Sequence, residues 1–199
     1  GYSAKPMHSY WDDFWALKGL EDAVWMAGTL GHPDEGARWG SIRHEFERDL
    51  LASIARVRAE KGIAYLPGCA ELADFDATSS TVALWPAGAD AKLPAEAVEA
   101  TWERYWREAE ARFTGRAAWE GYTPYEWRSV GSLVRLGQRD RAVLVARWLM
   151  ADRMPAAWNQ WPEVVHENPT KAAYLGDLPH AWVGSDFIRS FLDMLAYER

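Results

Sequence analysis

The sequence predicts an all-α fold built from antiparallel helical hairpins. Apolar residues recur at steps of three and four in several segments, Gly or Pro follows most of these segments, and no segment shows a convincing strand pattern. Short β segments in the loops remain compatible with this pattern. The 199 residues can form one domain with its own core, so we expect a single helical domain over residues 1–199.

The first two helices are delimited by familiar signals. Ser9 and Asp12 have capping-box spacing, and Gly31 is expected to end the helix that they begin. The second helix begins near Asp34 and ends near Gly62. Its apolar residues form one stripe and its charged residues take the other side, so we expect one face in water.

The later helices follow the same rules. Pro86 and Gly88 stop a short helix, Pro94 suits the first turn of the next one, and Gly115 and Gly137 separate the helices that follow. The expected helices, about seven in all, cover residues 9–31, 34–61, 79–86, 94–113, 124–136, 138–153 and 181–198.

Aromatic and acidic clusters mark the starts of alternate helices, near residues 11, 78, 124 and 181. The helices between them are long, charged and amphipathic. In an array of hairpins every second helix lies in an inner layer, and the N-terminal ends of those helices gather on one rim. We therefore predict that the clusters meet at that rim.

The clusters combine flat rings with carboxylates. The chain has 13 tryptophans, more than a core of this size requires, and rings held at a surface bind sugars, aromatic groups or cations. The expected rim residues are Trp11, Trp119, Trp127, Trp158, Trp161, Trp182, Asp12, Asp13, Glu71, Asp74, Asp76, Glu120, Glu126, Glu163 and Asp177. The tryptophans expected in the core are Trp25, Trp39, Trp102, Trp106 and Trp148.

The composition excludes several other partners. The net charge is −7 without a Lys/Arg cluster, which argues against nucleic acid. No apolar run reaches the length of about 18 residues that a membrane span needs. Cys69 is the only cysteine, so no intrachain disulfide forms and the compartment stays undetermined. The opening residues lack the apolar core of a signal peptide, and we expect a soluble protein.

Four segments resemble the six-hairpin (α/α)6-barrel glycosidases, a group that includes glucoamylase, trehalase and α-rhamnosidase-like enzymes. SYWDDFWALKGLEDA resembles the helix-opening motif of that group, and DFDATSS the Asp-led start of an inner helix in its trehalase-like members. WNQWPEVV resembles the segment that carries the catalytic base in rhamnosidase-like members, and LPHAWVGSDFIRSFLDML their last inner helix. The matches follow the family order over about residues 8 to 198.

The resemblance implies the C-terminal portion of an (α/α)6 toroid, because a complete barrel has six hairpins and about seven helices are expected here. The remaining N-terminal half would come from a further segment or a partner chain, unless the chain is a shortened relative that closes its core differently.

The resemblance also implies an inverting glycoside hydrolase with a carbohydrate substrate. Glu163 would be the general base and Glu71 the general acid, with their carboxyl groups roughly 6.5 to 9.5 Å apart. This chemistry requires no metal and no organic cofactor. The expected substrate-binding residues are Trp11, Asp12, Asp13, Asp76, Tyr122, Glu126, Trp127, Trp161, His180 and Trp182.

Structural roles remain open for some of these residues. Asp12 or Asp13 can interact favourably with the positive, N-terminal end of a helix dipole. Asp76 can cap its helix, and His180 can donate a hydrogen bond to a loop carbonyl.

Two other functions compete with the hydrolase. DDFWALKGLED superficially resembles the aspartate-rich helix of terpene synthases, but sharing magnesium would need a carboxylate four residues after Asp12, where Ala16 stands. The five histidines show no HExxH spacing for zinc. The second competitor is a non-catalytic carbohydrate-binding or scaffold fragment of a larger glycosidase.

Overall fold

The structure is a computed structural model that describes residues 5–171 and 176–197. Its described part contains seven α-helices and two strands of two residues each, so the all-α prediction is confirmed. The chain forms two compact units. The N-terminal unit runs to Trp102 and the C-terminal unit starts at Glu103, within helix α4 (Ala95–Phe113).

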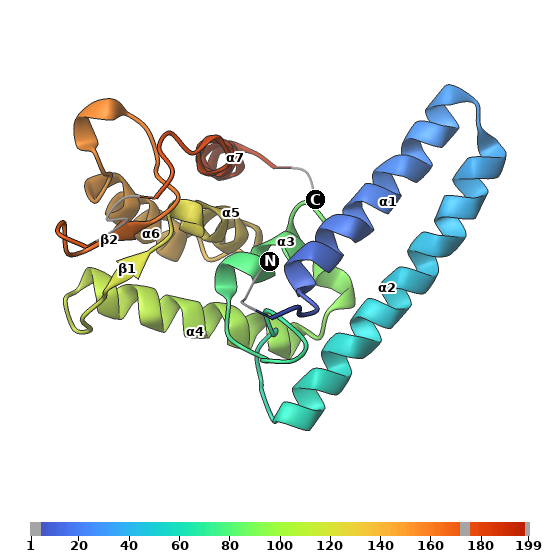
Figure 1. Ribbon diagram of the computed structural model, residues 1–199, viewed down its shortest axis with the longest axis horizontal. Helices are drawn as coiled ribbons and strands as arrows, with labels where there is room; N and C mark the ends of the chain where they lie inside the picture. The colour runs from blue at the N-terminus through green and yellow to red at the C-terminus, as the bar shows by residue number, and fades with distance from the viewer. Residues whose placement is uncertain (1–4, 172–175, 198–199) are drawn as a thin grey trace. The chain divides into compact units, whose positions relative to one another are not determined.

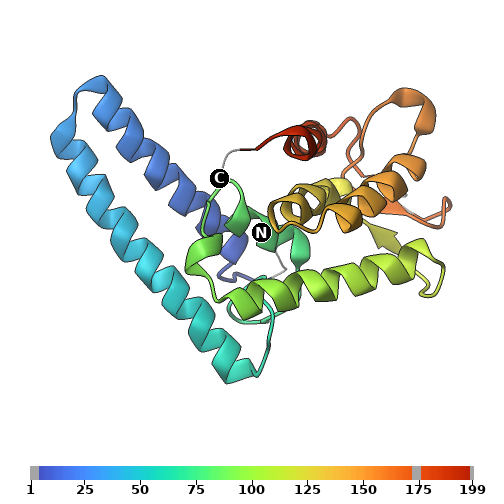
Figure 2. The same ribbon diagram turned by 180° about the vertical axis from the view of Figure 1, so that it is seen from behind.

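Two long helices, α1 (Tyr10–Leu30) and α2 (Pro33–Lys61), form an antiparallel hairpin in the N-terminal unit and lie side by side in both views (Figures 1 and 2). Gly31 ends α1 with φ 77°, a left-handed conformation that costs glycine little, and Gly62 ends α2 in the same way with φ 64°. Both glycine stops lie where the sequence predicts them.

Only part of this hairpin is buried. Phe14 and Leu17 on α1 and Leu50 and Ile54 on α2 belong to the core. Trp25 is 68% exposed, so its predicted place in the core is wrong. An i, i+4 stripe identifies the buried face of a helix, but it does not show how far along the helix the partner surface extends.

The rest of the N-terminal unit packs against the start of α1. Helix α3 (Ala77–Leu84) contacts α1, and the loop before it forms an isolated bridge between Ser9 and Cys69. The backbone N–H of Leu66 donates to the Thr101 hydroxyl over 2.8 Å and so ties this loop to α4. A 3-10 helix, η1 (Asp90–Lys92), precedes α4.

The C-terminal unit is organised around helix α5 (Trp127–Arg135), which contacts both α6 (Arg139–Ala151) and α7 (Ala181–Leu195). Gly137, with φ 77°, lies in the turn between α5 and α6. The strands pair antiparallel, with Gly121 opposite His166 and Tyr122 opposite Val165. The elements of this unit after α4 are β1 (Gly121–Tyr122), the 3-10 helix η2 (Pro124–Glu126), α5 (Trp127–Arg135), α6 (Arg139–Ala151), the 3-10 helix η3 (Ala156–Trp158), β2 (Val165–His166) and α7 (Ala181–Leu195).

Close approach of α5 and α7 depends on a glycine. A Cβ atom at Gly131 would lie 3.1 Å from Oδ2 of Asp193 and 3.2 Å from the Ser190 hydroxyl. The fully buried Trp127 fills the interface beside them and meets Phe187 edge to face at 4.8 Å. The backbone carbonyl of Trp127 accepts a hydrogen bond from the Ser190 hydroxyl, which fixes the register of the two helices.

Some predicted boundaries differ from the observed ones. Ser9 is the N-cap residue of α1, but its side chain makes no capping hydrogen bond, so the predicted capping box does not form. The predicted helix at 124–136 starts as the 3-10 helix η2, and α7 ends at Leu195. Residue 198, the predicted end of that last helix, lies outside the described residues.

Among the described residues, no helix combines the length and the apolar character that crossing a membrane would require.

Candidate functional site

Two loop segments of the C-terminal unit pair beside the start of α7. The N–H of Glu163 donates to the carbonyl oxygen of Asp177 over 3.0 Å, and the N–H of Gly176 donates to that of Val164 over 2.9 Å. A Cβ atom at Gly176 would lie 2.9 Å from the Val164 nitrogen and 3.2 Å from Cβ of Glu163. Glycine therefore lets the two segments approach closely enough to set Glu163 beside Asp177.

Further hydrogen bonds tie these loops to the starts of α5 and α7. The Thr123 hydroxyl donates to the Glu163 carbonyl oxygen over 2.7 Å. The His180 N–H donates to the Trp161 carbonyl oxygen over 2.8 Å. Trp161 is buried and packs edge to face on Trp127, with ring centroids 5.3 Å apart. The loops therefore rest on the aromatic core of the unit.

The side chains of Glu163, Asp177 and His180 form a compact cluster. Each offers one oxygen or nitrogen atom, and these three atoms lie within 4.8 Å of one another. Asp177 is exposed, whereas Glu163 and His180 are half-buried. Two acidic groups and an imidazole thus share one small site that solvent reaches.

Tyr125 connects this cluster to α5. Its hydroxyl lies 2.5 Å from Nε2 of His180, and the two rings meet edge to face. Trp182, 42% exposed, packs edge to face on Tyr125 with ring centroids 6.0 Å apart. The exposed ring of Trp182 therefore contacts Tyr125, which in turn contacts His180 of the cluster.

Arg128 supports these rings from α5. Its guanidinium lies 4.2 Å from the ring centroid of Tyr125 and 5.2 Å from that of Trp182, within cation–π range. Nε of Arg128 donates to Oδ2 of the buried Asp186 over 2.6 Å. The Arg128–Asp186 pair thus fixes the guanidinium under the rings.

Burial and nearby charges shift the acidity of this region. Burial raises the pKa of Asp186 to about 6, although Arg128 acts in the opposite direction. The pKa of the Tyr125 phenol is raised by burial first; Arg128 lowers it, and the charges of Glu163, Asp186 and Asp177 raise it further. The phenol therefore stays protonated and can donate a hydrogen bond to His180.

Three predicted substrate-binding residues are buried in structural contacts instead. The Tyr122 hydroxyl donates to Oδ2 of Asp152 over 2.7 Å. Glu126 accepts from the Tyr105 hydroxyl over 2.9 Å and from Arg112 over 2.5 Å. Trp127 lies at the centre of the core. All three side chains are buried within the unit, so their predicted role in binding a substrate stays a prediction that burial does not support.

Trp161 also departs from the predicted role. Its ring is buried and cannot stack on a sugar, while its backbone carbonyl holds His180.

Glu71, the predicted acid, lies in the N-terminal unit as one half of an ion pair. Its carboxylate accepts from the His8 backbone N–H over 3.0 Å and lies 2.6 Å from Nδ1 of His8. These hydrogen bonds lower the pKa of Glu71 and raise that of His8. The pair tethers the chain before α1 to the loop that contains Cys69.

Asp13 lines a pocket of about 250 Å³ in the N-terminal unit, with His8, Tyr10 and Arg56 among its other walls. Burial raises the pKa of Asp13, and the charge of Asp12 adds to that shift. Asp12 is exposed in the first turn of α1.

Trp11 and Asp76 complete the predicted set. Trp11 is half-buried and meets Trp15 edge to face at 6.1 Å. Asp76 caps α3: Oδ1 accepts from the Ser79 N–H over 3.1 Å and from the Thr78 hydroxyl over 2.7 Å, while Oδ2 accepts from the Ser79 hydroxyl. The capping role considered for Asp76 is therefore the one observed.

The structure thus brings together Glu163, His180 and Trp182 among the predicted residues. Trp11, Asp12, Asp13, Glu71 and Asp76 belong to the N-terminal unit, so the separation expected between Glu71 and Glu163 stays a prediction. Tyr125, Arg128 and Asp186 lie at the site although no sequence motif predicts them there, and the sequence predicts Asp177 only as a rim carboxylate. The Asp-x-x-His spacing of Asp177 and His180 was the available signal.

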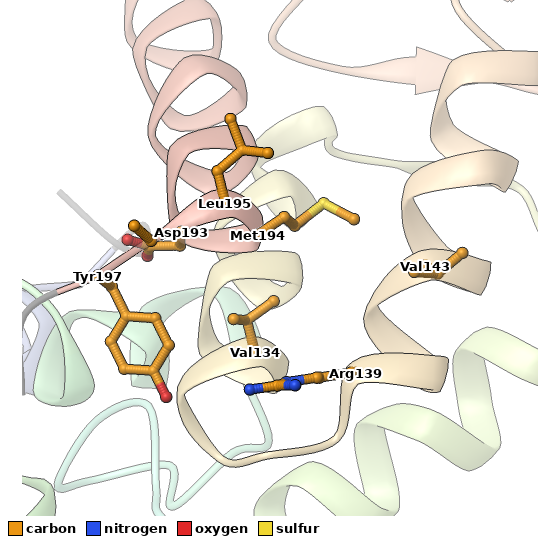
Figure 3. A pocket seen from close by; sticks show the side chains of 8 residues that line it. Val134, Arg139, Val143, Asp193, Met194, Leu195 and Tyr197 are labelled. Atoms are coloured by element: carbon orange, nitrogen blue, oxygen red, sulfur yellow. The ribbon is translucent and has the colours of Figure 1, made fainter.

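A pocket of the C-terminal unit is larger than the one that Asp13 lines, and neither Glu163, Asp177 nor His180 lines it. Figure 3 shows this pocket of about 590 Å³ at the C-terminal end of α7, where Met194 points toward the helix that carries Val143. Asp193 on its wall is already paired with Arg135 and Arg189. None of the predicted site residues lines it.

No protein-family model, curated protein or solved structure matches the chain.

Proposed function

We propose that the protein is a glycoside hydrolase that acts with inversion and uses Glu163 as its general base. The observation that carries this proposal is the cluster in which Glu163, Asp177 and His180 share one site, close to the exposed ring of Trp182. A sugar presents an apolar face of C–H groups and an edge of hydroxyl groups. It therefore needs a flat ring together with hydrogen-bonding carboxylates.

In the proposed reaction Glu163 takes a proton from a water molecule as the water oxygen attacks the anomeric carbon. The glycosidic C–O bond breaks, and the leaving oxygen takes a proton from a general acid on the opposite face. Glu71 is the acid that the family resemblance implies. Because the hydrogen bonds from His8 lower the pKa of the Glu71 carboxyl, proton donation requires this pair to open and the carboxyl to be protonated.

The test is hydrolysis of a panel of aryl glycosides and oligosaccharides by the wild type and by Glu163→Gln. Glutamine keeps the shape of the side chain but cannot accept a proton, so we expect turnover to fall roughly 10²- to 10⁴-fold. Glu167→Gln is the matched control, because Glu167 is an exposed carboxylate on the other side of β2 and outside the cluster. It should keep wild-type turnover.

Non-catalytic carbohydrate binding is the second candidate, and the ion pair between His8 and Glu71 favours it because an ionised carboxyl is no proton donor. A protein of this kind binds sugars through its exposed rings. Saturable binding of an oligosaccharide, with no turnover in either the wild type or Glu163→Gln, would establish it in place of the hydrolase.

A further inference from the structure

We propose that Asp177 is a second catalytic carboxylate of this site, and that it holds the attacking water together with Glu163 and His180. This inference rests on the proposed function, because a hydrolase needs a water molecule at its base. It adds a residue that neither the sequence motifs nor the family resemblance assigned to the reaction.

The size of the cluster fits a single water molecule. The three polar atoms lie within 4.8 Å of one another. Some point is therefore within about 2.8 Å of all three, a normal hydrogen-bond length for oxygen. A water molecule at that point can contact Glu163, Asp177 and His180 at the same time.

The chemical types of the three groups also suit a nucleophilic water. Water donates two hydrogen bonds and accepts two. Glu163 and Asp177 are acceptors when ionised, and His180 can donate a ring N–H. These three bonds use both hydrogens and one lone pair, so the second lone pair stays free to attack the anomeric carbon.

The backbone that carries the three groups, and the ring of His180, are held in place independently of a substrate. Asp177 is fixed by its carbonyl oxygen, which accepts from Glu163, and His180 by its N–H, which donates to Trp161. The Tyr125 hydroxyl contacts Nε2 of His180. When the phenol donates this bond, the remaining ring nitrogen carries the imidazole proton. Such preorganisation avoids reorienting the water during reaction.

Protons and bonds balance in this scheme. The water oxygen forms a bond to the anomeric carbon, and one of its protons passes to Glu163. The glycosidic bond breaks, and the leaving oxygen receives the proton of the general acid. Asp177 accepts a hydrogen bond from the other water hydrogen throughout and keeps its charge. Its contribution is orientation of the reacting oxygen.

The test compares steady-state kinetics of the wild type, Asp177→Asn, Glu163→Gln and the control Glu167→Gln on the best substrate of the panel. Asparagine offers only one acceptor oxygen and presents an amide N–H in place of the other, so the water is misplaced. We expect kcat to fall about 10- to 100-fold with KM within about 2-fold of the wild type. Because Asp177 is exposed, melting curves of the folded variant should match the wild type and exclude unfolding as the cause.

The possible results are distinct. Wild-type kcat in Asp177→Asn, alongside a large loss in Glu163→Gln, overturns the role of Asp177 and leaves the hydrolase intact. No turnover by the wild type overturns both proposals.

Each assay is repeated with EDTA and with added calcium. If EDTA removes the activity, and calcium restores it in the wild type but not in Asp177→Asn, the cluster is a cation site and the water-binding role is overturned. EDTA-insensitive activity with the expected loss supports it.

Discussion

The backbone N–H of Glu163 donates a hydrogen bond of 3.0 Å to the carbonyl oxygen of Asp177. This bond sets two acidic residues from different loops next to each other, and the neighbouring bond from Gly176 to Val164 continues the pairing. The proposed chemistry of the site depends on this local backbone arrangement. It can be disturbed without changing any polar side chain.

Gly176→Ala should damage the site through the backbone. The added Cβ would meet the Val164 nitrogen at 2.9 Å, so the paired segments must separate. We expect a loss of about 1 to 3 kcal/mol in the free energy of unfolding, together with reduced turnover. Gly184→Ala is the control, because nothing lies within 4 Å of its added Cβ and alanine favours the helix. Equal unfolding midpoints for Gly176→Ala and the wild type in guanidinium chloride would contradict this account.

Much of the fold follows from short-range signals in the sequence. Gly31, Gly62 and Gly137 stop or turn the chain where predicted, because the left-handed backbone conformation that they adopt strains other residues. Amphipathic stripes identify helices in the same local way. How far the tip of the α1–α2 hairpin is buried depends instead on which surface is available to cover it, and Trp25 there is exposed to solvent.

The site was less predictable, for physical reasons. Glu126 and Trp127 look like a binding cluster in sequence, but the turn of η2 directs both into the core, where Arg112 and Tyr105 pair with the carboxylate. Asp177 joins Glu163 through pairing of two irregular loops, which no periodic pattern reveals. His180 and Trp182 were predictable because aromatic and polar residues flank the start of a helix.

Glu71→Gln should separate the catalytic role of Glu71 from its structural one. If Glu71 protonates the leaving oxygen, the variant should lose most of its turnover of unactivated oligosaccharides, by about 10²-fold or more. It should lose far less on nitrophenyl glycosides, whose leaving groups need little protonation. The measurement is kcat/KM for both substrate types. Equal losses on both would remove Glu71 as the acid.

Asp186 should make the stability of the C-terminal unit depend on pH. Burial raises its folded pKa to about 6, so the folded state binds the proton more tightly than the unfolded chain, whose aspartate pKa is near 4. The contribution of Asp186 to the free energy of unfolding is fully present below about pH 4 and is lost as the pH rises through about 6. The loss is on the order of 2 kcal/mol.

Asp186→Asn removes this titration. Guanidinium unfolding between pH 4 and 7 should show the wild type losing stability relative to the variant as the pH rises. If the difference in the free energy of unfolding between the wild type and Asp186→Asn stays constant across that pH range, the Asp186 carboxyl has an ordinary pKa.

Trp182→Ala should weaken sugar binding. The exposed ring packs on Tyr125 close to the cluster, and loss of a stacked aromatic surface costs about 0.5 to 1.5 kcal/mol, a roughly 2- to 10-fold rise in Kd. Trp158→Ala is the matched control, because Trp158 is also exposed but belongs to η3. Calorimetric titration with an oligosaccharide measures both. An unchanged Kd for Trp182→Ala would place the sugar elsewhere.

The most direct test of Glu163 as the base is chemical rescue of Glu163→Ala by azide. Azide is a nucleophile that needs no proton removed, so it can replace the water that the variant fails to activate. The account predicts that azide restores cleavage of an activated aryl glycoside and that NMR identifies a glycosyl azide of inverted anomeric configuration. A glycosyl azide of retained configuration, or wild-type hydrolysis by Glu163→Ala without azide, would contradict it.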